Sequence, residues 1–340
     1  MPQSILKRAQ SEGTPLIDGD KATFVWHGHT PPQLIGDFNR WNPREAIGWR
    51  KLAPDVWTHT LKLLRDAYIE YAFVRDGQHV TDRFNANVAP NGYGGYNHYF
   101  YMAGGPTSLI ERRRNVRRGL VTRHVIESDL VFGGRRAVYL YHPPIDQPCP
   151  LIVVFDGRDY LRRVRLPHIV DNLVAEGCMQ PVALALIDHG GSARIQEYSA
   201  SEAIIGFVLT KVLPLARSQL NLTEPGNYGV LGASLGGLTS LVMGLRYPKV
   251  FNRILSQSAS VILRGHETVV FDLVRARFNP RAKIWLDVGR YELNKSANRH
   301  FRDWLATMNY DATYREFHAG HNYAAWRDDV WRGLEALFPL

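Results

Sequence analysis

Hydrophobic and polar residues alternate in short runs over the first hundred residues of the chain. These runs are rich in β-branched and aromatic residues, and turn-forming segments such as Arg75-Asp76-Gly77 separate them. Short strands with this spacing predict a small all-β sandwich, which we expect to span residues 1–105. The expected strands are 22–27, 33–35, 56–63, 69–74 and 96–102.

From about residue 121 the pattern changes to strands that alternate with amphipathic helices. Two of these strands, 151–155 and 182–187, are continuous apolar runs, as expected where helices cover both faces of a sheet. The alternation predicts an α/β domain over residues 121–340 with a mostly parallel sheet. The expected strands are 137–141, 151–155, 182–187, 228–231, 253–256, 282–288 and 313–317, and the expected helices are 166–176, 200–220, 236–246, 296–308 and 323–337.

Length and composition agree with two globular domains. The chain has 340 residues, of which 45% are hydrophobic and 21% charged, which excludes disordered and fibrous proteins. Its apolar runs are far shorter than the roughly 20 residues of a membrane-spanning helix, and the first ten residues do not resemble a signal peptide. Only two cysteines occur, Cys149 and Cys178, without the spacing of a zinc site. We therefore expect a cytoplasmic protein with no stable membrane association.

The formal charge of 41 − 32 = +9 favours anionic partners. Six arginines crowd the region around the expected connector 106–120, where they could contact nucleic acid or lipid headgroups. Because no recognition helix or zinc-finger pattern accompanies them, we favour a solvated connector and expect no nucleic-acid partner. The arginines are Arg112, Arg113, Arg114, Arg117, Arg118 and Arg123.

The segment 228–238 contains Gly-x-Ser-x-Gly between an apolar strand and an amphipathic helix. This context is typical of a nucleophile elbow, a tight turn that raises the serine hydroxyl above the carboxyl edge of a sheet. We expect Gly232 and Gly236 to permit the tight turn that presents Ser234 as the nucleophile. The backbone N–H of Leu235 would then bind an oxyanion. The alternative is that Ser234 caps the helix.

A serine nucleophile needs a histidine to accept its proton and a carboxylate to orient that histidine. In such folds the acid and then the histidine follow the serine in the chain. We predict His321, beyond the last expected strand, as the base in preference to His318 at the strand end. We predict Glu292, three residues after Gly289, as the acid, with Asp287 inside the preceding strand as the alternative.

A second oxyanion donor usually follows an earlier strand of the sheet. Here the strand 151–155 leads directly into Asp156-Gly157-Arg158. Because glycine adopts unusual backbone angles easily, we expect Gly157 to turn the next N–H, that of Arg158, toward the oxyanion.

Together these motifs resemble the esterase D group of α/β-hydrolases, and more narrowly the enterochelin (ferric enterobactin) esterases, over most of residues 120–340. The resemblance implies a cytoplasmic serine esterase that opens serine trilactone esters of a catecholate siderophore without a catalytic metal or cofactor. It carries Ser234, Glu292 and His321 over as nucleophile, acid and base. The motifs are Leu-Ile-Val-Val-Phe-Asp-Gly-Arg at 151–158, Ala-Leu-Ile-Asp at 185–188, Gly-Ala-Ser-Leu-Gly-Gly-Leu at 232–238, Leu-Ser-Gln-Ser at 255–258 and Gly-His-Asn-Tyr-Ala-Ala-Trp-Arg at 320–327.

The resemblance also suggests substrate-binding residues. Arg194 looks like the family's substrate-side arginine, with an internal pair to Glu197 as the alternative. Arg158 and Trp326 are further candidates. A ferric tris-catecholate is strongly anionic, so a basic protein would attract it. The expected partner is a small anionic ester, and the oligomeric state is left open.

The first domain resembles the early-set, immunoglobulin-like β-sandwich found in front of these esterases and in glycogen-branching enzymes. The likeness lies in Gly36-Asp37-Phe38-Asn39-Arg40-Trp41. In sugar-binding relatives two exposed tryptophans stack on glucose rings, whereas this chain has Gln78-His79 in place of the second. We therefore favour a domain whose tryptophans pack its core and whose loops shape the mouth of the esterase. Those tryptophans are Trp26, Trp41 and Trp57.

Two other functions use the same features. A carbohydrate esterase acting on acetyl or feruloyl groups has the same elbow, although enzymes acting on plant polymers need export. A non-catalytic polysaccharide-binding protein would not need an intact set of serine, acid and histidine. Transfer of the acyl group to an acceptor other than water is also open.

Overall fold

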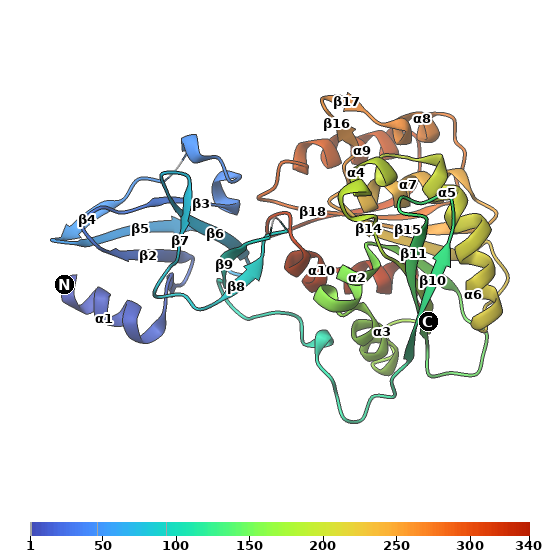
Figure 1. The fold of residues 1–340 in the computed structure, drawn as a ribbon, viewed down its shortest axis with the longest axis horizontal. Coiled ribbons are helices and arrows are strands. Elements are labelled where there is room, and N and C mark those ends of the chain that lie inside the picture. Colours follow the sequence, from blue (N-terminus) through green and yellow to red (C-terminus); the bar gives the residue numbers. More distant parts are fainter. Residues whose placement is uncertain (1, 46, 93) are drawn as a thin grey trace. The chain divides into compact units, whose positions relative to one another are not determined.

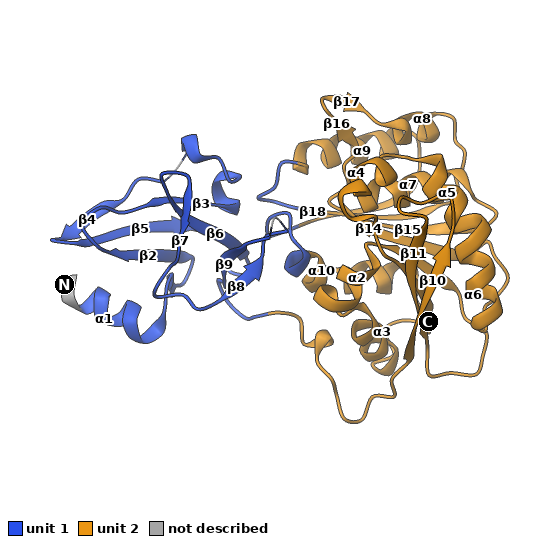
Figure 2. Cartoon of the chain, viewed as in Figure 1, with its two compact units in different colours: residues 1–105, 289–293, 317–325 blue, residues 106–288, 294–316, 326–340 orange. Residues whose placement is uncertain are grey.

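The structure is a computed structural model that describes residues 2–45, 47–92 and 94–340. The chain forms two compact units (Figure 2). The first contains residues 1–105 together with two short segments, 289–293 and 317–325, and the second contains the remaining residues. The sequence had not suggested that the two short segments belong with the sandwich.

The first unit is built from two antiparallel sheets (Figure 1). One sheet pairs, in order, β1 (Leu16–Asp18), β2 (Lys21–His27), β5 (Val56–Lys62) and β4 (Arg50–Ala53). The other pairs β3 (Gln33–Gly36), β6 (Tyr68–Arg75), β9 (Tyr96–Tyr101) and β8 (Val88–Pro90), and β7 (Gln78–Val80) pairs with β6. Phe24 of β2 packs edge-to-face on Tyr71 of β6 with ring centroids 4.9 Å apart, so the two sheets share one aromatic core.

A short helix that the sequence did not predict, α1 (Pro2–Glu12), precedes the sandwich. It buries Ala9 against Leu16 and Val25. Most of its other residues are polar, so its apolar stripe is too narrow to stand out in the sequence pattern.

The second unit contains an eight-stranded mixed sheet. Its first two strands pair antiparallel, and the strands from β13 to β18 run parallel to one another. The order is β10 (Leu120–Glu127), β11 (Arg135–His142), β13 (Ala183–Ile187), β12 (Leu151–Phe155), β14 (Tyr228–Ala233), β15 (Phe251–Gln257), β18 (Lys283–Gly289) and β19 (Asp311–Phe317).

Helices cover both faces of this sheet, as the apolar strands predicted. Successive side chains of a strand point to opposite faces. On β15, Ile254 contacts Gly244 of α7 (Leu235–Arg246), while the next residue, Leu255, contacts Gly333 of α10 (Tyr323–Leu337). The sheet is therefore the middle layer of three. The other helices are α2 (Gly157–Asp159), α3 (Leu166–Ala175), α4 (Arg194–Tyr198), α5 (Glu202–Phe207), α6 (Leu213–Gln219), α8 (Val269–Arg275) and α9 (Lys295–Thr307).

These layers confirm the predicted fold class, an α/β-hydrolase domain preceded by an all-β domain. One predicted helix differs: the run 200–220 is α5, a π-helical turn at Val208–Val212, and α6. Pro214 explains the interruption, because it has no N–H with which to continue regular α-helical bonding. Among the described residues no single helix is long and apolar enough to cross a membrane, although one bent pair, 191–198 with 202–219, meets that test together.

A buried ion pair connects β11 to α4. Nη1 of Arg136 donates to Oε2 of Glu197 at 2.9 Å, and both side chains are 3% exposed. Glu197 also accepts the backbone N–H groups of Phe132 and Gly190. The pair thus fixes α4 and the loop before it to β11, the second strand of the sheet.

We expect Glu197→Ala to lower the free energy of unfolding by about 3–5 kcal/mol, because it leaves the Arg136 guanidinium buried without its carboxylate. Urea denaturation followed by tryptophan fluorescence measures this. The matched control is Glu202→Ala, which breaks a surface pair with Arg246 and should cost about 1 kcal/mol or less. Equal losses in the two variants would contradict this account of α4.

Candidate functional site

The candidate nucleophile lies in the turn between β14 and α7. Ser234 has φ 59° and ψ −120°, a strained conformation that non-glycine residues adopt mainly at functional turns. A Cβ atom on Gly232 would lie 2.5 Å from the carbonyl carbon of Gly236, so this approach of strand and helix requires glycine. The backbone N–H of Ser234 donates to the carbonyl of Gln257 at 2.8 Å and secures the turn.

The Ser234 hydroxyl is half-buried at the start of α7. It makes no capping hydrogen bond within the described helix, so the alternative role as a helix cap is wrong. Its Oγ lies 3.4 Å from the Oγ of Ser260, in the segment after β15. The N–H of Leu235 belongs to the first turn of α7, where N–H groups have no partner within the helix. An oxygen that gains negative charge beside Ser234 could accept a hydrogen bond from it.

A buried hydrogen-bond network adjoins the elbow. The Tyr160 hydroxyl donates to Oε1 of Gln257 at 2.9 Å, and Nε2 of Gln257 donates to Oδ2 of Asp287 at 3.2 Å. The indole N–H of Trp326 donates to Oγ of Ser258 at 2.9 Å. Trp326 is only 4% exposed, and its contact with substrate stays a prediction. Its ring packs in the interior and supports the segment that follows β15.

The candidate acid and base contact each other in the first unit. Oε2 of Glu292 accepts a hydrogen bond from Nδ1 of His321, and Oε1 accepts the backbone N–H of Gly289. The Glu292 side chain is buried, whereas 37% of the His321 side chain is exposed. A carboxylate at Nδ1 leaves Nε2 of the imidazole to accept a proton from another group. This arrangement suits a general base.

The two alternatives have other partners. Asp287 is buried within β18, where its Oδ2 also accepts the indole N–H of Trp285 at 2.9 Å. Nδ1 of His318 lies 2.6 Å from Oδ1 of Asp66. The structure therefore brings Glu292 and His321 together and places Asp287 and His318 in separate contacts.

The second oxyanion donor was predicted from unusual backbone angles at Gly157, and the structure does not show them there. The positive φ belongs to Asp156, at 57°, and not to Gly157. Glycine is required at 157 because a Cβ there would lie 2.5 Å from the carbonyl carbon of Leu186 in β13. The N–H of Arg158 lies in the first turn of α2, so Arg158 stays a predicted donor. Its guanidinium is exposed, with Nη2 2.7 Å from Oδ2 of Asp188.

Arg194 is paired, but not with Glu197, so that alternative is wrong. Its Nε and Nη2 donate to the two carboxylate oxygens of Asp156 at 2.6 and 2.7 Å. Nη2 also lies 3.5 Å from the carbonyl oxygen of Ala233, the residue before Ser234. Arg194 is thus close to the elbow with its charge largely balanced by Asp156. Its role toward substrate stays a prediction.

Sequence reasoning missed Asp156 and Ser260 as members of this site. Asp156 directly follows the apolar strand β12, and the carboxyl ends of parallel strands are where binding residues gather. That position could have identified it. Ser260 lies 26 residues after Ser234 in a segment with no motif, so no sequence signal distinguishes it.

The described part of the chain contains no cluster of three or more His, Cys, Asp or Glu side chains that could hold a metal ion.

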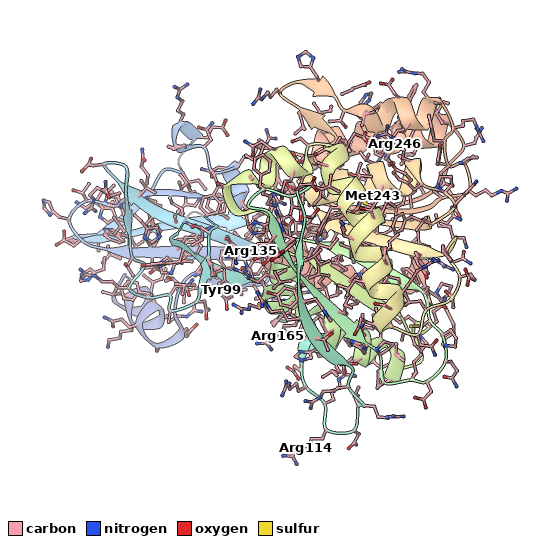
Figure 3. The ribbon with its side chains drawn as sticks, turned by 45° about the vertical axis from the view of Figure 1, so that its right-hand side comes forward. Tyr99, Arg114, Arg135, Arg165, Met243 and Arg246 are labelled. Carbon is pink, nitrogen blue, oxygen red and sulfur yellow. The ribbon has the colours of Figure 1, made fainter. Side chains whose placement is uncertain are left out.

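The Arg-rich connector is largely exposed. Arg114 lies in the loop of this segment and extends outward from it (Figure 3). Arg113 instead forms an ion pair with Glu176 of the α3 end. A solvated connector agrees with this exposure, and the absence of a nucleic-acid partner stays a prediction.

Comparisons with known proteins place the chain in a family. A family model described as "Putative esterase" matches residues 131–337, and the chain belongs to this esterase family of hydrolases. The Iron(III) salmochelin esterase of Escherichia coli O6:H1 is 24% identical in an alignment that covers 97% of this chain and 92% of the relative.

Solved structures agree with the same relationship. The enterobactin esterase of Shigella flexneri, crystallised in the presence of enterobactin, has a TM-score of 0.76 at 20% identity and covers 93% of this chain and 92% of its own. A ferulic acid esterase has a TM-score of 0.59 at 16% identity and covers 66% of this chain and 98% of its own. The resemblance to enterochelin esterases predicted from the motifs is confirmed.

The close approach at Gly232 generates a test of the elbow. We expect Gly232→Ala to lower the free energy of unfolding by at least about 2 kcal/mol and to slow any reaction of Ser234, because the new methyl group overlaps the backbone of Gly236. Thermal unfolding with fluorophosphonate labelling measures both effects.

The matched control is Gly206→Ala in α5, where the nearest atom to the added methyl is a side-chain carbon 3.6 Å away. This change should be neutral or stabilising by up to about 1 kcal/mol. A Gly232→Ala protein as stable and reactive as the control would show that the turn does not require glycine.

Proposed function

We propose that this protein is a serine esterase in which Ser234, His321 and Glu292 form the catalytic triad. The observation that carries the proposal is the strained turn at Ser234, which places a hydroxyl at the start of α7 without using it as a cap. The hydrogen bond between Glu292 and His321 supports their roles as the acid and the general base. The loops that carry these two residues follow β18, which lies beside β15 in the sheet, and β19, which lies beside β18.

The reaction has two halves. Oγ of Ser234 bonds to the ester carbonyl carbon while its proton passes to Nε2 of His321. The resulting oxyanion accepts hydrogen bonds from the N–H groups of Leu235 and Arg158, and Glu292 stabilises the imidazolium. The carbon–oxygen bond to the alcohol then breaks, and the alcohol takes the proton from His321. Water repeats the sequence on the acyl-enzyme and releases the acid.

We propose a catecholate siderophore ester as the substrate. The relative that aligns with nearly the whole chain is a salmochelin esterase, and the enterobactin esterase structure covers both units. The net charge of +9 would attract an anionic ferric catecholate. Arg158 contributes an exposed guanidinium near the proposed oxyanion donor, which suits catecholate oxygens.

A carbohydrate ester is the second candidate, and the ferulic acid esterase fold favours it. That fold covers only 66% of this chain, so it offers no counterpart for a third of it. We therefore rank the siderophore ester first. A non-catalytic sugar-binding role would leave the pairing of Glu292 with His321 without a purpose.

We also propose a reducing, cytoplasmic compartment. Both cysteines are free thiols, with Cys149 buried and Cys178 exposed. An exposed unpaired thiol is compatible with a reducing environment.

Ser234→Ala should lower kcat by about 10³-fold or more and abolish labelling by a fluorophosphonate, since the acyl-enzyme can no longer form. Hydrolysis of p-nitrophenyl acetate and intact-protein mass spectrometry measure these effects. Ser260→Ala is the matched control because its hydroxyl lies beside Oγ of Ser234. It should keep the label. If the probe labelled Ser234→Ala but not Ser260→Ala, Ser260 would be the nucleophile and the assignment of Ser234 would be wrong.

A substrate panel tests the second part of the proposal. We expect kcat/KM for a ferric catecholate trilactone to exceed that for a feruloyl sugar ester by at least about 100-fold, a difference of roughly 3 kcal/mol in transition-state binding. Higher kcat/KM for the feruloyl ester would favour the carbohydrate esterase. Binding of glycogen by a protein that no fluorophosphonate labels would favour the non-catalytic role.

A further inference from the structure

The acid and base of the proposed triad lie on segments that belong to the first unit (Figure 2). The backbone N–H of Tyr68, at the start of β6, donates to the carbonyl of His318 at 3.0 Å. The His318 side chain contacts Asp66, in the turn before β6. The sandwich therefore binds the His321 loop through both backbone and side chain.

A further contact of that loop with the sandwich is made by Asp37, in the Gly36–Trp41 motif. Asp37 is buried, and its two carboxylate oxygens accept the Trp41 indole N–H at 2.9 Å and the backbone N–H of Glu70 at 2.8 Å. The carboxyl group packs directly on Gly320, where a Cβ atom would lie 2.0 Å from Oδ1. Only glycine therefore fits at position 320, which lies against the Asp37 carboxyl group and directly precedes His321 in the chain.

The contact extends to the acid. A Cβ atom on Gly289 would lie 2.4 Å from the carbonyl oxygen of Ala319, and the N–H of Tyr291 donates to that oxygen at 3.2 Å. The Tyr291 side chain packs against the aromatic core of the sandwich. The two loops therefore interlock, and a displacement at Gly320 would reach Glu292 as well as His321.

We propose that Asp37 is a positioning residue for the pair of His321 and Glu292, so that the Gly36–Trp41 motif serves ester chemistry and not a sugar ligand. The inference rests on the proposed function only in assigning His321 as the base. It also gives Trp41 a structural role, because its indole N–H donates to Asp37 and supports the carboxyl group.

The electrostatic setting supports this role. Burial and the neighbouring negative charge of Glu70, with a smaller contribution from Glu292, raise the pKa of Asp37 to about 8. The raised pKa of Asp37 reduces the negative charge that this carboxyl group places beside Glu292.

A double-mutant cycle tests the contact. Gly320→Ala introduces a methyl group into the space of the Asp37 carboxyl, and Asp37→Ala removes the three atoms that it would overlap. We expect Gly320→Ala to lower kcat for p-nitrophenyl acetate by about 100-fold with little change in KM, as expected when a reacting group is misplaced by about 1 Å. The kcat of the double variant should be at least about tenfold higher than that of Gly320→Ala.

A spectroscopic readout makes the test independent of turnover. The Nδ1 proton of His321, bound to Glu292, should give a low-field NMR resonance that His321→Gln abolishes. We expect this resonance to weaken in Gly320→Ala and in Asp37→Asn, and to return in the double variant with both alanine changes. Asp82→Asn is the matched control, because Asp82 is an equally buried acid of the sandwich that bonds to Tyr71 and Thr14.

The outcomes separate the two proposals. Asp37 is not a positioning residue if the kcat loss of the double variant equals the product of the losses in Gly320→Ala and Asp37→Ala. The same conclusion follows if the His321 resonance is as strong in Asp37→Asn as in Asp82→Asn. If Ser234→Ala retains turnover, the proposed function fails, while the His321 resonance still decides the role of Asp37.

Discussion

The tight connection between β14 and α7 is the constraint on which the proposed chemistry depends. Ser234 occupies a strained backbone conformation with positive φ that costs on the order of 1–3 kcal/mol, and the surrounding structure must compensate for that cost. It does so through the glycine contact between Gly232 and Gly236 and through the bond from the Ser234 N–H to Gln257. Tyr160 fixes the Gln257 side chain in turn. The apolar parallel sheet supplies the rigid frame for this turn, as reactive residues require.

The residues of the proposed triad come from segments of both units. The second unit supplies the hydroxyl and the backbone N–H groups, while the segments that carry Glu292 and His321 belong to the first. A β-sandwich in front of a hydrolase domain is easily regarded as a separate binding module. The packing of Asp37 on Gly320 instead makes it part of the support for the acid and the base.

Local patterns were predictable from the sequence, and distant pairings were not. The elbow depends on neighbours within five residues, and α10 follows from an amphipathic pattern whose bounds, Tyr323–Leu337, were predicted correctly. Glu292 could be preferred over Asp287 because a residue past the strand end is free to reach a neighbouring loop. By contrast, the partner of Arg194 is 38 residues away, and no pattern in the sequence distinguishes Asp156 from Glu197 as that partner. The motif at 320–327 marks Trp326 but does not reveal that its ring lies in the interior.

In the proposed mechanism the pair of His321 and Glu292 activates Ser234. The rate constant for phosphonylation of Ser234 by a fluorophosphonate tests it most directly, in the wild type and in His321→Ala with and without added imidazole. The account predicts a loss of about 10³-fold or more in His321→Ala, and a partial recovery with imidazole that saturates at high concentration. A His321→Ala protein that reacts at the wild-type rate would contradict it.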